Sequence, residues 1–479
     1  MRKAMLVAAI AVLGATTAVP AASAAPNTLT WGPCPAGAFP TPDLQCTTLK
    51  VPLDYREPGG RTIDVAVSRL PSRTPERRRG VLLTNPGGPG GGGLDYPQLL
   101  KYVKLPQEVL DSYDIIGFDP RGVAHSTPVT CDLTPEQIAV GNLPYANGPA
   151  DVVKQAAIAK REAEQCAGSK TASMLPYVTT ANTARDMDRI RTALGEPKVS
   201  FLGASYGTYL GAVYTTLFPE RSDRIVLDSN LGPGGYDIDA MRGFGRGMED
   251  RFPDFAAFAA KHPEYGLGTT PAQVTAKFHE LAARLDRTPV GGVTGSVFRG
   301  LTFEGLYSTD LTKLAEDWQG LEQGRAPKPP AEPVTGVENL LASRFAVICG
   351  DSAWPRSIAS YQLDVAVDRV RYPLLGAASA NIAACAYWAP PAEPRVRITG
   401  HGPANVLMVQ NQRDPGTPLS GARKLRAAFG DRARMVTVDQ GGHGVYPFTP
   451  NRCANTAVTE FLVTGQRPAH DLACAAETP

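Results

Sequence analysis

The sequence lacks a surplus of charge of either sign. Its 48 Lys and Arg residues nearly balance its 46 Asp and Glu residues, which leaves a formal net charge of +2 over 479 residues. A nucleic-acid-binding domain carries a basic patch or stripe, and the sequence shows no sustained one. We therefore expect no nucleic acid among the partners of this protein.

Long hydrophobic runs are also missing. A membrane-spanning helix needs an uninterrupted apolar run of about 18 residues, and no such run follows the N-terminal segment. That segment has a short apolar stretch at about 4–20, preceded by Arg2-Lys3 and followed by Ala22-Ser23-Ala24. Charged, apolar and small-residue zones in this order are typical of a secretory signal peptide. We expect removal of residues 1–24 and a secreted, extracellular protein without stable membrane insertion.

Cysteine patterns that bind metals are absent as well. The sequence has no C-x-x-C pair and no His at zinc-finger spacing, so we expect no metal. The eight cysteines form an even set, which in an exported chain is typical of disulfide bonds. Closing short loops between neighbours is the simplest arrangement. It predicts the pairs Cys34 with Cys46, Cys131 with Cys166, Cys349 with Cys385, and Cys453 with Cys474.

Strand signals occur in two groups with helical patterns between most of them. Short β-branched or apolar runs bounded by Gly, Pro and Asp occupy residues 63–67, 81–84, 113–118, 199–203, 224–228, 405–409 and 435–438. Helical patterns occupy residues 183–194 and 206–217, a segment after Pro418, and about 454–463. Apolar strands that alternate with helices indicate a mostly parallel sheet with helices on both faces.

The strand rhythm stops between residues 231 and 400. Helical segments at 254–260, 271–285 and 311–323 replace it, with a proline-rich break at Ala326-Pro327-Lys328-Pro329-Pro330. We interpret this stretch as a helical cap or lid, inserted between two parts of one core at 25–230 and 401–479.

Gly203-Ala204-Ser205-Tyr206-Gly207 has the form G-x-S-x-G. The motif is weak evidence alone, because a turn rich in Gly and Ser can match it without any chemistry. Here it stands between a predicted buried strand and a predicted helix, which is the setting that a nucleophile elbow requires. Ser205 is therefore the candidate nucleophile.

A serine hydroxyl becomes a good nucleophile only when a base takes its proton. Of the six histidines, only His443 lies in a glycine-rich loop directly after a predicted strand. The imidazole in turn needs a carboxylate to orient it and to stabilise its charged form. Asp414 follows the strand at 405–409, and Asp228 is the rival acid. The order Ser205, Asp414, His443 is that of the α/β-hydrolases, which favours Asp414.

The reaction also needs an oxyanion hole, in which backbone N–H groups stabilise the carbonyl oxygen as it gains charge. We expect one donor at Tyr206 and the other at Gly88, in the loop Asn85-Pro86-Gly87-Gly88-Pro89-Gly90. The run Gly88-Pro89-Gly90-Gly91-Gly92-Gly93 also satisfies G-x-G-x-x-G, and Asp119 ends the next strand, so a dinucleotide site is the competing interpretation. The proline in the motif, the export signal and the separate Ser, Asp and His set argue against it.

With these motifs the sequence resembles the secreted bacterial tripeptidyl aminopeptidases, α/β-hydrolases related to the prolyl aminopeptidases. The resemblance rests on Asn85-Pro86-Gly87-Gly88-Pro89-Gly90, Asp119-Pro120-Arg121-Gly122, Gly203-Ala204-Ser205-Tyr206-Gly207-Thr208-Tyr209-Leu210-Gly211, Asp414-Pro415-Gly416-Thr417-Pro418 and Gly442-His443-Gly444. One departure is Val123-Ala124-His125-Ser126, where the family more often has a second glycine.

The resemblance implies an α/β-hydrolase fold, with a mostly parallel eight-stranded sheet and a helical cap. It implies release of short N-terminal peptides, typically tripeptides, from peptides or proteins with free N-termini through an acyl-enzyme. An esterase or lipase would use the same triad, and a binding protein can keep the fold without activity. The proposed chemistry needs no metal or organic cofactor, and the sequence does not fix the oligomeric state.

An aminopeptidase must also hold a charged α-amino group, which calls for carboxylates at the far wall of the cleft. The cap is the natural source of such groups. Asp351, Glu249 and Asp250 are the candidates, and the alternative for each is a solvated surface acid.

Overall fold

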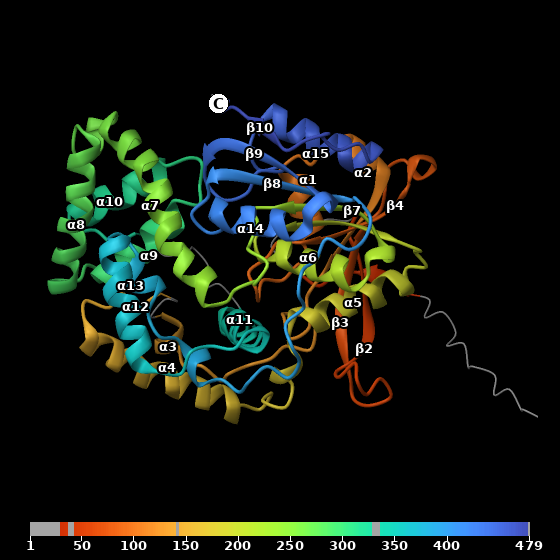
Figure 1. The fold of residues 1–479 in the computed structure, drawn as a ribbon, viewed down its shortest axis with the longest axis horizontal. Coiled ribbons are helices and arrows are strands. Elements are labelled where there is room, and N and C mark those ends of the chain that lie inside the picture. Colours follow the sequence, from red (N-terminus) through yellow and green to blue (C-terminus); the bar gives the residue numbers. More distant parts are fainter. Residues whose placement is uncertain (1–28, 37–42, 140–142, 328–335, 478–479) are drawn as a thin grey trace, which may run out of the picture.

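The computed structural model describes residues 29–36, 43–139, 143–327 and 336–477. In these residues ten strands form one sheet, in the order β1-β2-β3-β5-β4-β6-β7-β8-β9-β10 (Figure 1). The expected signal segment at 1–24 lies outside the described residues. The strands are β1 (Gly32–Pro33), β2 (Gln45–Pro52), β3 (Thr62–Leu70), β4 (Gly80–Asn85), β5 (Tyr113–Phe118), β6 (Val199–Ala204), β7 (Ser222–Asp228), β8 (Val406–Arg413), β9 (Ala433–Gly441) and β10 (Leu472–Cys474).

The sheet is parallel from β5 to β10, and the strands at the β1 end pair antiparallel. Each strand expected from the sequence is present, and several are longer than expected. The described sheet has ten strands where eight were expected. Its two end strands span only 2 and 3 residues, which is too short to leave a periodic pattern.

Helices cover both faces of the sheet, because the central strands are apolar on both sides. In β4, Leu82 packs into the core with α1 (Tyr96–Tyr102), α2 (Gln107–Ser112) and α15 (Arg452–Thr464). The next residue, Leu83, packs into the core with α5 (Thr180–Ala193), α6 (Tyr206–Leu217) and α14 (Leu419–Phe429). This is the doubly covered α/β arrangement of the α/β-hydrolases.

A layer of helices lies to one side of the sheet (Figure 1). Most of it comes from the chain between β7 and β8: α7 (Ile238–Ala260), α8 (Pro271–Arg287), α9 (Gly295–Gly305), α10 (Thr312–Glu322), α11 (Val337–Asp351), α12 (Ile358–Arg371) and α13 (Gly376–Ser379). It also contains α3 (Pro135–Ala139) and α4 (Pro149–Gly168), which follow β5. These two helices fall within the expected core segment 25–230, but α4 packs against α12, where Gln362 Nε2 donates to the Pro149 carbonyl at 3.1 Å.

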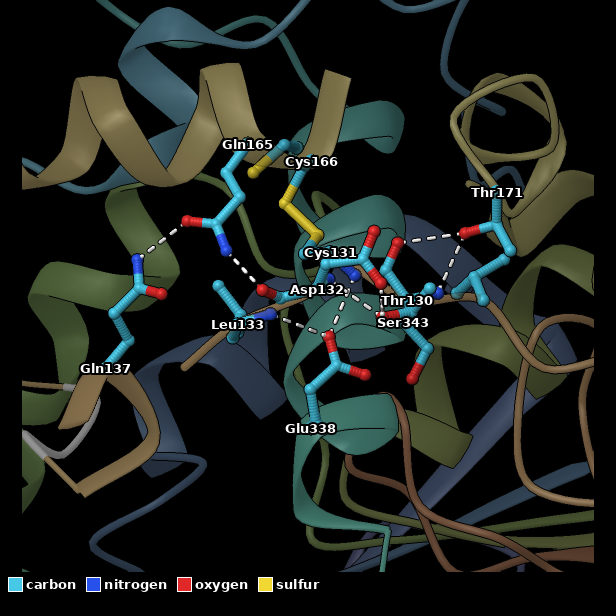
Figure 2. The surroundings of a disulfide bond; sticks show 12 residues. Thr130, Cys131, Asp132, Leu133, Gln137, Gln165, Cys166, Thr171, Glu338 and Ser343 are labelled. Carbon is cyan, nitrogen blue, oxygen red and sulfur yellow. Dashed lines mark hydrogen bonds between the residues drawn. A yellow bond between two sulfur atoms is a disulfide. The ribbon is translucent and has the colours of Figure 1, made fainter. Parts of the chain in front are cut away.

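Four disulfide bonds join the couples expected from their order along the chain: Cys34–Cys46, Cys131–Cys166, Cys349–Cys385 and Cys453–Cys474. Figure 2 shows that Cys131–Cys166 ties α4 to the segment after β5. Glu338 of α11 accepts hydrogen bonds from the N–H groups of Cys131, at 2.8 Å, and Leu133, at 3.3 Å. The two insertions of the helical layer are thus joined at this disulfide. Among the described helices, none has the length and apolar character to cross a membrane.

Candidate active site

Ser205 stands at the turn between β6 and α6. Its φ of 56° and ψ of −125° lie outside the regions that most residues adopt, which costs energy unless the surroundings hold the backbone in place. They do so here, because its N–H donates to the Asp228 carbonyl at 2.9 Å and its carbonyl accepts from the Thr208 N–H at 2.9 Å. The strained turn presents the side chain at the carboxyl end of the sheet.

Glycines let three backbone segments meet at this turn. A Cβ on Gly203 would lie 2.4 Å from the Gly207 carbonyl oxygen, and one on Gly207 would lie 2.7 Å from that of Asn85. A Cβ on Gly87 would lie 2.9 Å from Cβ of Ser205. The G-x-S-x-G pattern and the first glycine of the loop after β4 are therefore required by close packing.

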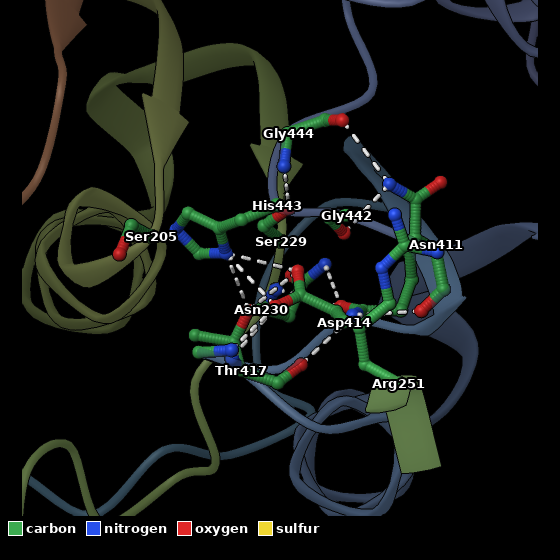
Figure 3. A network of polar contacts seen from close by, with 12 residues as sticks. Ser205, Ser229, Asn230, Arg251, Asn411, Asp414, Thr417, Gly442, His443 and Gly444 are labelled. Atoms are coloured by element: carbon green, nitrogen blue, oxygen red, sulfur yellow. Dashed lines mark hydrogen bonds and ion pairs between the residues drawn. The ribbon is translucent and has the colours of Figure 1, made fainter. Parts of the chain in front are cut away.

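His443 and Asp414 meet through the loops that follow β9 and β8. The imidazole Nδ1 lies 2.9 Å from Oδ1 and 3.0 Å from Oδ2 of Asp414. Figure 3 shows Ser205 on the other side of the imidazole, away from Asp414. Donors from its own loop hold the carboxylate: the Gly416 and Thr417 N–H groups, both at 2.9 Å, and the Thr417 hydroxyl at 3.0 Å.

The surroundings of His443 favour its charged form. Burial opposes the charge, but the negative charge and hydrogen bond of Asp414, with the charge of Asp228, outweigh it and raise the pKa of His443. An imidazole with this environment is suited to accept a proton and hold it.

Asp228, the rival acid, has a different place. Its carboxylate accepts from the N–H groups of Val445, at 2.9 Å, and Tyr446, at 2.7 Å, just after His443. Burial raises the pKa of Asp228 to about 6, which these hydrogen bonds oppose. Asn411 holds the same loop from β8, since Nδ2 donates to the carbonyls of Gly442, at 2.9 Å, and Gly444, at 3.1 Å.

The two expected oxyanion donors lie in neighbouring segments, since a Cβ on Gly87 would lie 3.1 Å from the Tyr206 nitrogen. The Gly87 N–H is already taken by the Asn85 side chain at 3.0 Å. In the part of the chain that the structure describes, neither the Gly88 N–H nor the Tyr206 N–H donates a hydrogen bond. Both donors are available for a ligand near Ser205.

The same loop does not resemble a dinucleotide site. Asp119 accepts from the N–H groups of Gly93, at 2.9 Å, and Leu94, at 3.0 Å, and lies 2.9 Å from Nδ1 of His125. A Cβ on Gly90 would lie 2.4 Å from the Leu340 carbonyl oxygen, so α11 packs directly on the glycine run. The acid that would bind a ribose is engaged, and the loop is covered.

Two tyrosines complete the surroundings of the candidate site, and no sequence pattern indicated either. Burial raises the pKa of Tyr236, while the charge of Arg344 and a hydrogen bond with Ser205 oppose this rise. Tyr307 packs against the imidazole of His443, with ring centroids 4.7 Å apart, and its carbonyl accepts the His443 N–H at 2.8 Å. The helical layer therefore contacts both Ser205 and His443.

Comparisons with known proteins agree with this architecture. A family model described as "TAP-like protein" matches residues 372–474. A tripeptidyl aminopeptidase of Streptomyces lividans is 36% identical over 96% of this chain and 88% of its own length. This chain belongs to the tripeptidyl aminopeptidase family. Two Mycobacterium tuberculosis proteins are also similar: serine protease Hip1, 28% identical over 93% of this chain and 90% of its own, and carboxylesterase B, 32% identical over 93% and 89%.

For a member of the tripeptidyl aminopeptidase family, the site that holds the substrate amine is of particular interest. Asp351 accepts the N–H and hydroxyl of Thr180, at 2.9 and 2.5 Å, and so caps α5. Glu249 accepts the Leu374 N–H at 2.9 Å, and Asp250 pairs with Arg246 at 3.4 Å. Each of the three expected carboxylates has a partner within the protein, and none is seen among the contacts of Ser205 or His443.

Glu304, at the end of α9, differs from those three. Within the described residues its carboxylate forms no hydrogen bond or ion pair. It lies one turn before Tyr307, whose N–H its carbonyl accepts at 3.0 Å. Glu304 is exposed, but partial desolvation by the surrounding helices raises its pKa, an effect that the charge of Arg344 opposes. Glu304 thus offers a carboxylate without a partner, near Arg344 of α11 and on the helix that leads to Tyr307.

Proposed function

We propose that this protein is a secreted serine exopeptidase that releases tripeptides from the free N-termini of peptides and proteins. The observation that carries the proposal is the placement of Ser205, Asp414 and His443 directly after β6, β8 and β9, at the carboxyl ends of parallel strands in one part of the sheet. The order and setting are those that α/β-hydrolases use for acyl transfer. Family membership supports peptides as the substrate class.

In the proposed mechanism, Ser205 Oγ attacks the carbonyl carbon of the third peptide bond while His443 takes the hydroxyl proton. The N–H groups of Gly88 and Tyr206 stabilise the oxygen as it gains charge. His443 then gives the proton to the leaving nitrogen, and the C–N bond breaks to leave an acyl-enzyme. Water, activated by His443, hydrolyses the ester and frees the tripeptide. Asp414 keeps the proton on Nδ1 throughout.

We further propose Glu304 as the group that binds the α-ammonium of the substrate. A carboxylate without a protein partner, on the layer that covers the nucleophile, fits a charged amine better than the three engaged acids. Recognition of the amine would restrict cleavage to chain ends, because a blocked or internal residue offers no positive charge.

A labelling experiment tests the reaction class. A fluorophosphonate probe should react with the protein and fail to react with the Ser205→Ala variant. Absence of labelling in the unmodified protein would instead support a binding protein that keeps only the fold. Rates on tripeptide amides with free and acetylated amino termini then test the exopeptidase claim, since equal rates contradict it.

The competing enzyme function is carboxylic-ester hydrolysis. The 32% identical relative named carboxylesterase B favours it as the second candidate. Short acyl esters compared with tripeptide amides in the same assay separate the two, because a peptidase hydrolyses the better-recognised amide efficiently and a dedicated esterase does not. Secretion, proposed from the N-terminal segment, fits the four disulfide bonds.

A further inference from the structure

The helical layer contains a partly open cavity of about 280 Å³ between α4, α7 and α11 and the segment near Cys385. Most of its wall is apolar, including Ile158 of α4, Met241 of α7, Leu341, Phe345 and Ile348 of α11, and Ile382. An apolar cavity of about 150 Å³ already holds a benzene ring. The space therefore suits an apolar ligand group of side-chain size.

The cavity lies close to the candidate nucleophile. Arg344 of α11 forms part of its wall and also acts electrostatically on Tyr236, a neighbour of Ser205. Ile238, two residues beyond Tyr236, lines the cavity too. The backbone of Arg344 packs on the glycine loop, because a Cβ on Gly90 would lie 3.2 Å from the Arg344 nitrogen. Arg344 and the segment from Tyr236 to Ile238 thus connect the cavity wall to the surroundings of Ser205 and of the glycine loop.

The cavity lies on the side of the candidate site toward which the acyl part of a peptide substrate would extend. The leaving nitrogen must lie at His443, since that imidazole returns the proton. His443 is bordered by Tyr307 and the Asp414 loop. The acyl chain must therefore extend away from His443, and α11 lies against the loop that would bind the carbonyl oxygen.

We propose that this cavity is the subsite for one apolar side chain of the released peptide, and this rests on the proposed function. The side chain enters past Arg344, and its apolar surface leaves water for a wall of aliphatic and aromatic groups. The cavity wall carries two cations, Arg161 and Arg344, and one acid, Glu162, and this excess of positive charge disfavours a Lys or Arg side chain.

One series of substrates, measured on the unmodified protein and on a variant with a filled cavity, tests this subsite. Tripeptide amides with a free amine would carry Ala, norvaline, Leu, Phe or Lys at one position in turn. In the unmodified protein, kcat/KM at one position should rise by about 10- to 100-fold from Ala to Leu or Phe and should not rise for Lys. The Ile158→Trp variant fills the cavity and should lower the Leu-to-Ala ratio of kcat/KM toward 1.

A matched control lies on the same helix. Val153 of α4 is 50% exposed, so Val153→Trp adds the same bulk on the outer surface and should keep the full preference. Met241→Phe narrows the cavity from the opposite wall and replaces Ile158→Trp if that variant fails to fold. Equal effects on all substrates, or none on the Leu-to-Ala ratio, overturn the subsite.

Two further outcomes separate this proposal from the proposed function. If the unmodified protein cleaves no free-amine tripeptide amide, the proposed function fails. If it cleaves them, but the filling variants change only the hydrolysis of long acyl esters, the exopeptidase stands and the cavity serves an acyl chain. That second result contradicts the subsite proposed here.

Discussion

At the scale of single residues, His443 is the group whose protonation should govern the pH dependence of activity. The pKa of His443 is raised, because the charge and hydrogen bond of Asp414 outweigh burial. A general base works only when it is neutral, so kcat/KM should fall as the pH drops through this raised pKa. The acid limb of the pH profile should therefore lie above the ordinary histidine value of about 6.5.

Replacement of the partner acid tests the assignment. Asp414→Asn removes the charge that raises the pKa of His443, so the acid limb should move to lower pH. It should also lower kcat by roughly 10⁴-fold, since the amide no longer holds the correct tautomer. Asp228→Asn is the comparison variant, because Asp228 forms no hydrogen bond with the imidazole and acts on His443 through its charge and through the backbone of Val445 and Tyr446. A larger loss of kcat in Asp228→Asn than in Asp414→Asn would reverse the two roles.

Glu304 gives a second prediction at this scale. Glu304→Gln should raise KM for free-amine tripeptide amides by about 10- to 100-fold, which corresponds to one charge-assisted hydrogen bond. It should leave acetylated substrates unaffected. Because partial desolvation raises the pKa of Glu304, amine binding should weaken as the pH falls through that value. Asp250→Asn, on the outer side of α7, is the control. An equal rise of KM in this variant would indicate that the overall negative charge of the helical layer, and not Glu304, binds the amine.

At the scale of elements, α7 connects the helical layer to the loops of the candidate site. Arg251 is buried, and its guanidinium donates to the carbonyl of Ser308, at 2.8 Å, and to Asp254, at 2.6 Å. Asp254 in turn accepts from Arg413, directly before Asp414, at 2.8 Å. A Cβ on Gly441, two residues before His443, would lie 2.2 Å from the Arg251 guanidinium. One helix thus braces the loops of both the acid and the base.

Loss of this brace should affect stability and activity together. Arg251→Leu leaves the Ser308 carbonyl without its donor and Asp254 with Arg413 as its remaining partner, so the free energy of unfolding should fall by about 1–3 kcal/mol. The rate of the chemical step should fall with it, and Arg251→Lys should recover part of both. Arg246→Leu, on the exposed face of the same helix, should change stability by less than about 0.5 kcal/mol in urea titrations. Similar losses in the two variants would contradict the brace.

The elements also show how far the sequence alone predicts this protein. Ser205, Asp414 and His443 were found because each follows a strand in a pattern with a local signal, and the structure brings them together. Glu304 and Arg251 carry no such signal, since only tertiary packing brings α9 and α7 over the loops. The expected amine-binding acids were chosen by their position in the cap, which does not reveal that Asp351 caps a helix.

At the scale of the whole molecule, the helical layer is assembled from two insertions. The chain after β5 supplies α4, and the chain after β7 supplies α7 to α13. Strand periodicity marked the second insertion, because the pattern of strands stops there. Strand periodicity did not mark the first insertion. Its 20-residue helix α4 lies between two strands of the sheet, where a helix that covers the sheet is also expected. The cavity proposed as a subsite lies between the two insertions.

The Cys131–Cys166 disulfide should therefore control both the stability and the specificity of the layer. It closes a loop with a sequence separation of 35, so Cys131→Ser with Cys166→Ser should lower the free energy of unfolding by about 2–4 kcal/mol. Because α4 forms one wall of the cavity, its loosening should also reduce the Leu-to-Ala ratio of kcat/KM. Cys34→Ser with Cys46→Ser, at the far sheet edge, should lower stability but keep that ratio. An unchanged ratio in the first pair would show that α4 keeps its place without the covalent link, through Glu338 and the packing of α4 against α12.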